Sequence, residues 1–234
     1  MKDIADLCVT QIRIYPSDCL PFDYLALEAN ANVIKGAFEF AKVRTDSVPA
    51  VFEDGSFQYQ GQPTLVTSLV VQPRKTTLKV LGNSSAAEAV HERFMELFRG
   101  LNPAAAQGRC QPLVTTQETT CVVTLDVDFE NLISPRLTRF LQGYARGNLR
   151  SKSAIPTSIG LRRLSFEVRY EPADRSLLDH DVTLSKKLIT VEPRAGTPLR
   201  ERRFFTTSPT DSETHLALLR KLEEELSGPR KRKG

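Results

Sequence analysis

Several residue types that often mark an enzyme site are scarce in this sequence. The 234-residue chain has no tryptophan, only three histidines, which lie far apart, and four cysteines, none of them in a C-x-x-C pair. These spacings do not suggest a metal site. We expect the cysteines to be reduced, structural thiols. They are Cys8, Cys19, Cys110 and Cys121.

Long apolar runs and catalytic motifs are also absent. No apolar run approaches the roughly 18 residues that cross a bilayer, and the N-terminal residues do not start a signal-peptide pattern. We therefore expect a soluble intracellular protein without a membrane partner. No P-loop, G-x-G-x-x-G or Ser-His-Asp arrangement has a supporting context, and Asp179-His180-Asp181 has no partner motif. We predict no enzyme activity and no cofactor.

The composition is that of a globular protein. Hydrophobic residues make up 40% and charged residues 26% of the chain. A chain of this length can bury one large core or two cores of roughly 100 residues each. The net charge of +4 permits a polyanionic partner without requiring one.

One short phrase occurs twice, as Val71-Gln72-Pro73-Arg74 and Val191-Glu192-Pro193-Arg194. Each copy follows an apolar strand-like run and precedes a second strand and then a capped amphipathic helix. Cys121-Val122 resembles Cys8-Val9 at an offset of 121 − 8 = 113, and the two phrases differ by 191 − 71 = 120. The sequence therefore predicts an internal duplication.

The first unit is expected to span residues 1–101. Gly36 should stop its first helix, Asp54-Gly55 should turn a hairpin in an insertion at 46–63, and Ser85 and Glu88 have capping-box spacing. Alternation predicts the strands. The expected strands are 7–15, 38–44, 68–71 and 76–81, and the expected helices are 22–35 and 85–101.

The second unit is expected to span residues 120–227, after a linker at 102–119 that is rich in small and polar residues. Ser134-Pro135 should start its first helix, and Ser208-Pro209-Thr210-Asp211 should cap its last. Its expected strands are 121–124, 161–170, 186–191 and 199–207, with an insertion at 171–184. A basic tail follows at 228–234.

Each unit reads β-α-β-β-β-α, and an extra hairpin is possible in the first. This order predicts helices on one face of a largely antiparallel sheet, which is an α+β fold.

Particular residues of the first unit resemble the TATA-box-binding protein family. Leu25-Ala26-Leu27-Glu28-Ala29, followed by residues 38–44, is similar to that family's first helix and second strand. Leu78-Lys79-Val80-Leu81-Gly82, followed by Ser84-Ser85 and Glu88, is similar to its last hairpin and serine-capped helix. The resemblance implies a saddle, in which tandem pseudosymmetric repeats form a curved antiparallel sheet with helices on the convex face. The two V-x-P-R turns would be its stirrups.

In that family the concave face lies in the DNA minor groove, and phenylalanine pairs wedge between base steps. The resemblance therefore implies double-stranded promoter DNA as a partner, with cations at strand ends on phosphates. The groove side of the first strand would include Val9, and that of its counterpart Thr120. The other residues that the resemblance places at the DNA are Gln11, Arg13, Phe38, Lys42, Arg44, Val71, Arg74, Lys75, Lys79, Val122, Thr124, Arg163, Arg169, Arg194 and Arg202.

The sequence also departs from the family pattern. Val71 and Thr190 stand where wedge phenylalanines are expected, and Ile159 is the nearest candidate for another. Asp126 would lie opposite Arg13 (126 − 13 = 113), and a carboxylate facing phosphates is unfavourable. We therefore expect a saddle that binds DNA without sharp kinking, or that binds it only with general transcription factors or the RNA polymerase machinery.

The tail carries Arg230-Lys231-Arg232-Lys233. Such a run is consistent with nuclear import or an accessory phosphate contact, and equally with a solvated terminus. Together these features predict a nuclear transcription initiation factor.

Two other interpretations of the same residues stay open. The basic alternation on the strands is also typical of a solvated sheet face, and Phe38 and Phe40 are expected either at the nucleic acid or packed under the 46–63 insertion. The second functional hypothesis is a non-enzymatic duplicated scaffold that binds a protein or small ligand in its concave face. Asp126 and the missing wedge residues favour it.

Overall fold

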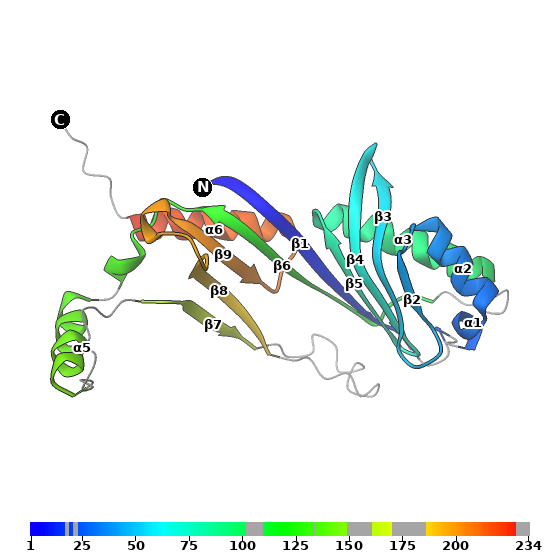
Figure 1. The fold of residues 1–234 in the computed structure, drawn as a ribbon, viewed down its shortest axis with the longest axis horizontal. Helices are drawn as coiled ribbons and strands as arrows, with labels where there is room; N and C mark the ends of the chain where they lie inside the picture. Colours follow the sequence, from blue (N-terminus) through cyan, green and yellow to red (C-terminus); the bar gives the residue numbers. More distant parts are fainter. Residues whose placement is uncertain are drawn as a thin grey trace.

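The computed structural model describes residues 1–16, 19–20, 23–101, 110–132, 134–148, 161–169 and 186–227. Within these residues nine strands form one antiparallel sheet, which with its helices confirms the α+β class (Figure 1). The strands are β1 Lys2–Ile14, β2 Lys42–Arg44, β3 Ala50–Tyr59, β4 Gln62–Gln72, β5 Lys75–Leu81, β6 Val114–Thr124, β7 Leu164–Val168, β8 Lys187–Pro193 and β9 Arg203–Ser208.

The strand order across the sheet is β2-β3-β4-β5-β1-β6-β9-β8-β7. Outward from β1 it runs through β5, β4 and β3, and outward from β6 it runs through β9, β8 and β7. The V-x-P-R phrases close β4 and β8, at matching places in this order. The first is a tight turn, because Gln72 pairs with Lys75, whereas a longer connection containing the short helix Leu199–Glu201 follows the second.

The described helices are α1 Asp23–Ala26, α2 Glu28–Ala37, α3 Ser84–Leu101, α5 Pro135–Asn148 and α6 Ser212–Ser227. Figure 1 shows α2, α3 and α6 along one face of the sheet, whereas α5 lies apart from it. We call the face under α2, α3 and α6 the helix face, and the opposite face the open face. On α5, Phe140 and Tyr144 are exposed.

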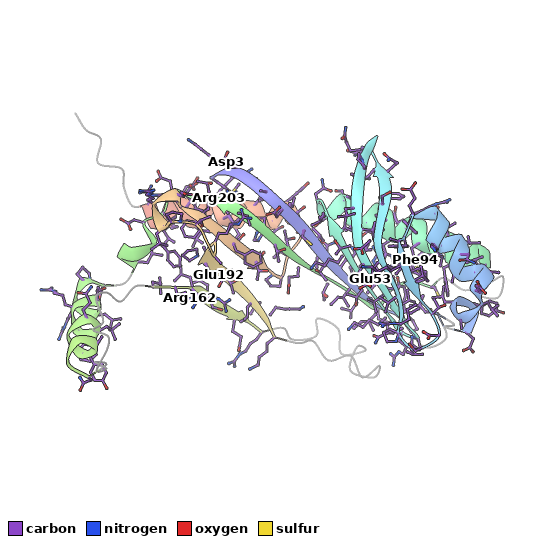
Figure 2. All side chains as sticks on the ribbon, in the orientation of Figure 1. Asp3, Glu53, Phe94, Arg162, Glu192 and Arg203 are labelled. Atoms are coloured by element: carbon purple, nitrogen blue, oxygen red, sulfur yellow. The ribbon has the colours of Figure 1, made fainter. Side chains whose placement is uncertain are left out.

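Each half of the sheet has its own apolar core on the helix face. In the first half, Phe94 and Phe98 of α3 pack with Leu69, Leu78 and Val80 of the sheet; Figure 2 labels Phe94 among these side chains. The core of the second half is smaller. It is built from Cys121, Val123, Leu125, Val127, Phe129, Val191, Phe204 and Leu219.

The helices α3 and α6 meet end to end through their first residues. The Ser84 N–H donates to Ser212 Oγ at 3.0 Å, and the Ser212 N–H donates to Ser84 Oγ at 2.8 Å. Helix N-termini leave several N–H groups without an intrahelical partner. Each helix therefore supplies one missing acceptor to the other.

Helix starts follow the sequence prediction at two of three positions. Ser134 Oγ accepts from the Leu137 N–H at 3.2 Å, and Asp211 Oδ1 accepts from the Thr214 N–H at 2.9 Å, as expected of N-caps. The predicted capping box at Ser85 and Glu88 is wrong, because Asn83 Oδ1 accepts from the Ala86 N–H instead. Glu88 is thereby left for a contact with the sheet.

The hairpin predicted at Asp54-Gly55 is also wrong. Residues 50–59 form one strand, and the turn lies at Gln60 and Gly61, both with positive φ, between the paired residues Tyr59 and Gln62. Such φ values suit the two-residue turns that match strand twist. Gly55 instead lets Phe40 pack closely, since a Cβ on it would lie 2.5 Å from the Phe40 ring.

Other predicted boundaries move as well. The helix expected at 22–35 is divided into α1 and α2, and the strand expected at 38–44 shortens to β2. The expected linker at 102–119 includes the start of β6, because residues 114–119 pair with β1. The insertion at 171–184 and the tail at 228–234 lie outside the described residues.

Gly55→Ala should destabilise the fold by about 1–3 kcal/mol, because the new methyl group would overlap both the Phe40 ring and the Phe38 carbonyl oxygen. Gly36→Ala on α2 is the matched control, since nothing lies within 4 Å of the place that its new methyl group would occupy. Alanine there should be neutral or stabilise by up to about 1 kcal/mol. Urea unfolding of both variants tests the packing, and equal effects would contradict it.

Two buried histidines make stability depend on pH. His215 accepts or donates hydrogen bonds to Ser208 at 2.6 Å and Thr206 at 3.0 Å. Burial lowers the pKa of His215 to about 4 and that of His91 to about 3. Both are therefore neutral in the native state, whereas in the unfolded chain a histidine takes up a proton near pH 6.5.

Stability should therefore fall as the pH drops below about 6.5, by up to about 1.4 kcal/mol per pH unit for each histidine. The loss continues until the folded-state pKa values are reached. His215→Gln, which does not titrate, should roughly halve the loss measured by urea unfolding between pH 7 and pH 5. The same loss in variant and parent would refute the assignment.

Candidate nucleic-acid interface

The open face consists of the strand side chains that point away from α3 and α6. Strand alternation and register assign them: Val9 and its partner Val80 are buried on the helix face, so Thr10 and its partner Lys79 belong to the open face. The same argument extends across the sheet through the paired strands. Lys42, Arg44, Lys75, Thr120, Thr124 and Phe205 fall on the open face.

The middle of the open face carries mostly threonines and aliphatic side chains, with Lys79 and Glu118 on either side of Thr10. Thr10, Ile12 and Ile14 of β1 lie beside Thr77 of β5 in register. Farther out, three apolar side chains are well exposed: Leu65 at 46%, Leu81 at 42% and Phe205 at 38%. Uncharged side chains of this size can approach the floor of a groove, but they supply no positive charge to attract phosphates.

Cations border this surface in the first half of the sheet. Arg44 ends β2, Lys75 begins β5 and Lys79 is exposed in the middle of β5. Lys42, also exposed, pairs with Asp54 at 2.8 Å, and the hydrogen bond to that carboxylate raises the pKa of Lys42. Glu53, labelled in Figure 2, is the acidic residue opposite Lys42 on β3.

The predicted cations of the second half are matched with carboxylates. Arg163 donates to Glu192 at 2.7 Å, and this contact raises the pKa of Arg163. Arg169 donates to Glu167 at 2.6 Å. Arg194 lies 3.7 Å from Asp6. These pairs are exposed or partly exposed, so each is weak in itself, but each also lowers the local positive potential.

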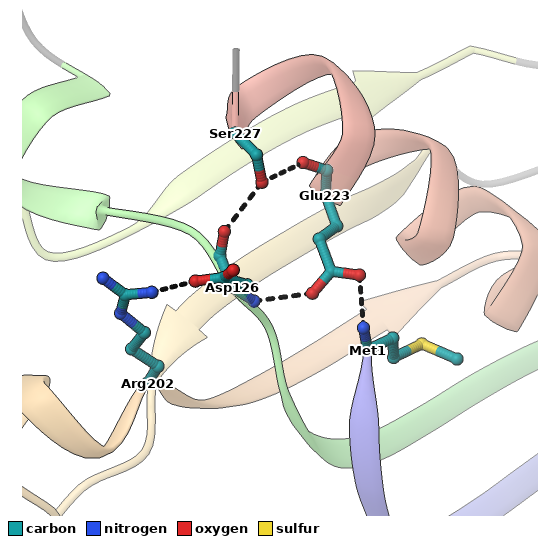
Figure 3. Close-up of polar contacts among 5 residues, drawn as sticks. All are labelled: Met1, Asp126, Arg202, Glu223 and Ser227. Atoms are coloured by element: carbon teal, nitrogen blue, oxygen red, sulfur yellow. Dashed lines mark hydrogen bonds and ion pairs between the residues drawn. The ribbon is translucent and has the colours of Figure 1, made fainter. Parts of the chain in front are cut away.

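Arg202 belongs to a polar network at the end of α6 rather than to the open face (Figure 3). It pairs with Asp126, whose N–H donates to Glu223 Oε1 at 2.6 Å. Ser227 Oγ donates to the Asp126 carbonyl at 2.7 Å, and the Met1 amine pairs with Glu223. These residues line a cavity of about 670 Å³.

Gln11 and Arg13 are corrections to the predicted interface. Both lie on the helix face, under α3, where Gln11 Nε2 donates to Glu88 Oε2 at 2.8 Å and Arg13 pairs with Glu88. Gln11 is fully buried and Arg13 is 9% exposed. Val9 is buried on the same side. The open face of β1 therefore carries Thr10, Ile12 and Ile14.

Phe38 and Val71 are also corrections, because both are fully buried in the first core. Phe38 follows α2 and packs against Phe57, with 5.8 Å between ring centroids. Phe40 packs against Phe52 at 5.5 Å. The interpretation that these phenylalanines pack under residues 46–63 is confirmed, and the interpretation that they meet bases is wrong.

The remaining predicted residues differ in exposure. Thr124 is on the open face and partly exposed, whereas Val122, on the same face, is buried between its partners Phe205 and Ala5. Arg74 is partly buried in the β4–β5 turn, where its Nε donates to the Tyr15 carbonyl at 3.3 Å.

The offset of 113 residues between the two predicted units explains part of the wrong assignment of side chains to the faces of β1. This offset matches Cys8, which lies on the open face, with Cys121, which lies on the helix face. Because side chains alternate along a strand, an alignment that is wrong by one residue assigns every side chain to the opposite face. Arg13 and Asp126 consequently do not oppose each other. They pair with Glu88 and Arg202 respectively.

Sequence reasoning missed Phe205, Arg203 and Thr207, which alternate on the open face of β9. Figure 2 labels Arg203 and Glu192 on neighbouring strands. The adjacent residues Phe204 and Phe205 could have indicated this face. Because side chains alternate along a strand, only one of the two can point to the core.

Three predicted features fall outside the described residues: Ile159, the Asp179-His180-Asp181 cluster and the basic tail. Among the side chains that are described, no three His, Cys, Asp or Glu residues converge as metal ligands. No described helix has the length and apolarity needed to span a membrane.

The pairing of Glu88 with Arg13 gives a test of the corrected face. Partial burial alone would raise the pKa of Glu88, but hydrogen bonds from Arg13 and Gln11 lower it overall. Glu88→Ala would leave a buried guanidinium without its carboxylate and should cost about 2 kcal/mol in urea unfolding. Glu92→Ala, one turn later and exposed, should change stability by less than about 0.5 kcal/mol. Similar losses in both variants would contradict the pairing.

Comparisons with known proteins add no relative to this picture. No protein-family model matches the chain, and no curated protein matches it. The candidate interface therefore stands on the chain's own residues.

Proposed function

We propose that this protein is a divergent TATA-binding-like transcription initiation factor that acts in the nucleus and has no enzymatic role. In this proposal its sheet forms a saddle of two tandem repeats, and the open face lies against promoter DNA. General transcription factors or the RNA polymerase machinery would bind elsewhere on the protein. The observation that carries the proposal is an antiparallel sheet with helices packed on one face and cations bordering the other.

The strand order supports the duplicated architecture. The sequence of strands outward from β1 has a counterpart outward from β6, and β5 and β9 each lead into a helix, α3 and α6, on the helix face. A tandem repeat joined at its first strands would have this order. The end-to-end contact of Ser84 and Ser212 lies at the same junction.

The character of the open face supports minor-groove binding. Threonines and aliphatic residues at its centre would meet base edges and sugars, and Arg44, Lys75 and Lys79 would meet phosphates. We propose that binding occurs without a strong TATA-type kink. The Val71 position is fully buried and Thr190 is 7% exposed, so neither is free to wedge between bases.

A second candidate function is a scaffold that binds a protein partner or small ligand on the open face. Glu118, which lies opposite Thr10 on that face, and the exposed Leu65, Leu81 and Phe205 favour it. A carboxylate at the centre of the surface disfavours phosphate, whereas exposed apolar patches are typical of protein interfaces.

Binding to a fluorescent promoter duplex, followed by anisotropy over a series of salt concentrations, tests the first candidate. Arg44→Ala with Lys79→Ala should lower the slope of log affinity against log salt by roughly 0.9 for each phosphate that the variant no longer neutralises. Arg163→Ala with Arg169→Ala should change the slope less, because Glu192 and Glu167 already pair with these arginines.

Arg93→Ala on α3 is the matched control, since Arg93 is an exposed cation on the helix face, paired with Glu96. It should leave the slope unchanged. No salt-sensitive binding by the parent protein, with or without transcription factors, would rule out the DNA proposal. Partner binding that survives high salt and the first-half substitutions would favour the scaffold.

A further inference from the structure

Two of the four cysteines are in contact beyond the ends of the β1 and β6 strands, which join the two halves of the sheet. Cys110 Sγ donates a hydrogen bond to the Cys19 carbonyl oxygen at 3.2 Å. Cys19 follows β1 and is partly exposed, whereas Cys110 precedes β6 and is 8% exposed. Both thiols are reduced in the structure.

The neighbouring strands explain why these residues meet. Ile14 pairs with Val114 at the end of the β1–β6 ladder, and the Leu113 N–H donates to the Ile14 carbonyl at 2.7 Å beyond it. The ladder ends at this pair, and Cys19 and Cys110 lie beyond it. The contact between Cys110 and the Cys19 carbonyl shows that the chain segments following β1 and preceding β6 come together at these two residues.

This placement suits a disulfide. Disulfides need Cα atoms about 4.4–6.8 Å apart, so the two cysteine backbones must lie close together. The 3.2 Å contact already brings one sulfur to the backbone of the other cysteine.

The other two thiols are poorly suited to reaction. Cys8 is 6% exposed and Cys121 is fully buried. Desolvation raises the pKa of both thiols, so the reactive thiolate form is disfavoured. They also lie on opposite faces of the sheet, which prevents them from pairing with each other.

We propose that Cys19 and Cys110 form a redox modification site that closes to an intrachain disulfide when a disulfide oxidant such as glutathione disulfide is present. The Cys19 thiolate attacks one glutathione sulfur, and the first glutathione thiolate leaves. The Cys110 thiolate then attacks the Cys19 sulfur of the mixed disulfide, and the second glutathione leaves. Two electrons pass to glutathione, and the two thiol protons end on the released glutathione or in solvent.

The crosslink would join residues 91 positions apart (110 − 19) and fix the junction of the two halves. A long closed loop restricts the unfolded chain strongly. Oxidation should therefore raise the thermal midpoint, by roughly 5 °C or more, without requiring a change in the fold.

The test treats the native full-length chain with glutathione disulfide, alkylates the remaining thiols after unfolding and maps peptides without reduction. We expect a Cys19–Cys110 linked peptide, a chain mass lower by two hydrogens, and alkylated Cys8 and Cys121. The same treatment in concentrated urea should give a mixture of pairs, which measures the selectivity that the fold provides.

Cys19→Ser should abolish both the linked peptide and the rise in thermal midpoint, whereas Cys8→Ser should leave both intact. A Cys19 that stays as a mixed disulfide with glutathione would overturn the proposal. So would a Cys19–Cys110 yield in the native protein no greater than in urea.

Discussion

The pairing of β1 with β6 is the interaction on which the rest of this structure depends. It joins two groups of strands into one sheet, with pairs from Lys2–Thr124 to Ile14–Val114. Because side chains alternate along each strand, the register of this ladder also decides which side chains point to the helices in both halves. The reciprocal contact of Ser84 and Ser212 links the two helices that cover the helix face of this junction.

Polar side chains of β1 are buried beside this ladder. Their hydrogen-bond partners explain which side chains of β1 point toward the helices. Gln11 and Arg13 point toward α3, although Ile12 and Ile14 on the same strand are the more apolar pair. Glu88 compensates by accepting hydrogen bonds from both. A buried guanidinium is tolerated only with such a partner. The open face consequently receives the aliphatic side chains and the helix face the charged pair.

The parts of this fold that local patterns determine could be predicted from the sequence. Alternation located β5 and β8, and side-chain caps located the starts of α5 and α6 through Ser134 and Asp211. The Glu88 contact could not be predicted, because a capping-box glutamate and a glutamate that reaches a strand 75 residues away have the same local sequence. Gly55 likewise has turn-forming neighbours, but tertiary packing against Phe40 decides its place in a strand.

The two halves of the open face differ in charge even though their strand orders correspond. In the first half Lys79 and Arg44 reach the surface at exposed positions, whereas in the second half Arg163 and Arg169 each have a carboxylate within 2.7 Å. A polyanion would have to displace Glu192 or Glu167 to use those arginines, and the gain from its phosphates would be reduced by the pairs broken. If the open face binds a duplex, the first half should therefore supply most of the electrostatic attraction. The protein would then bind the duplex in one direction, because reversing the duplex would not exchange two equivalent charged surfaces.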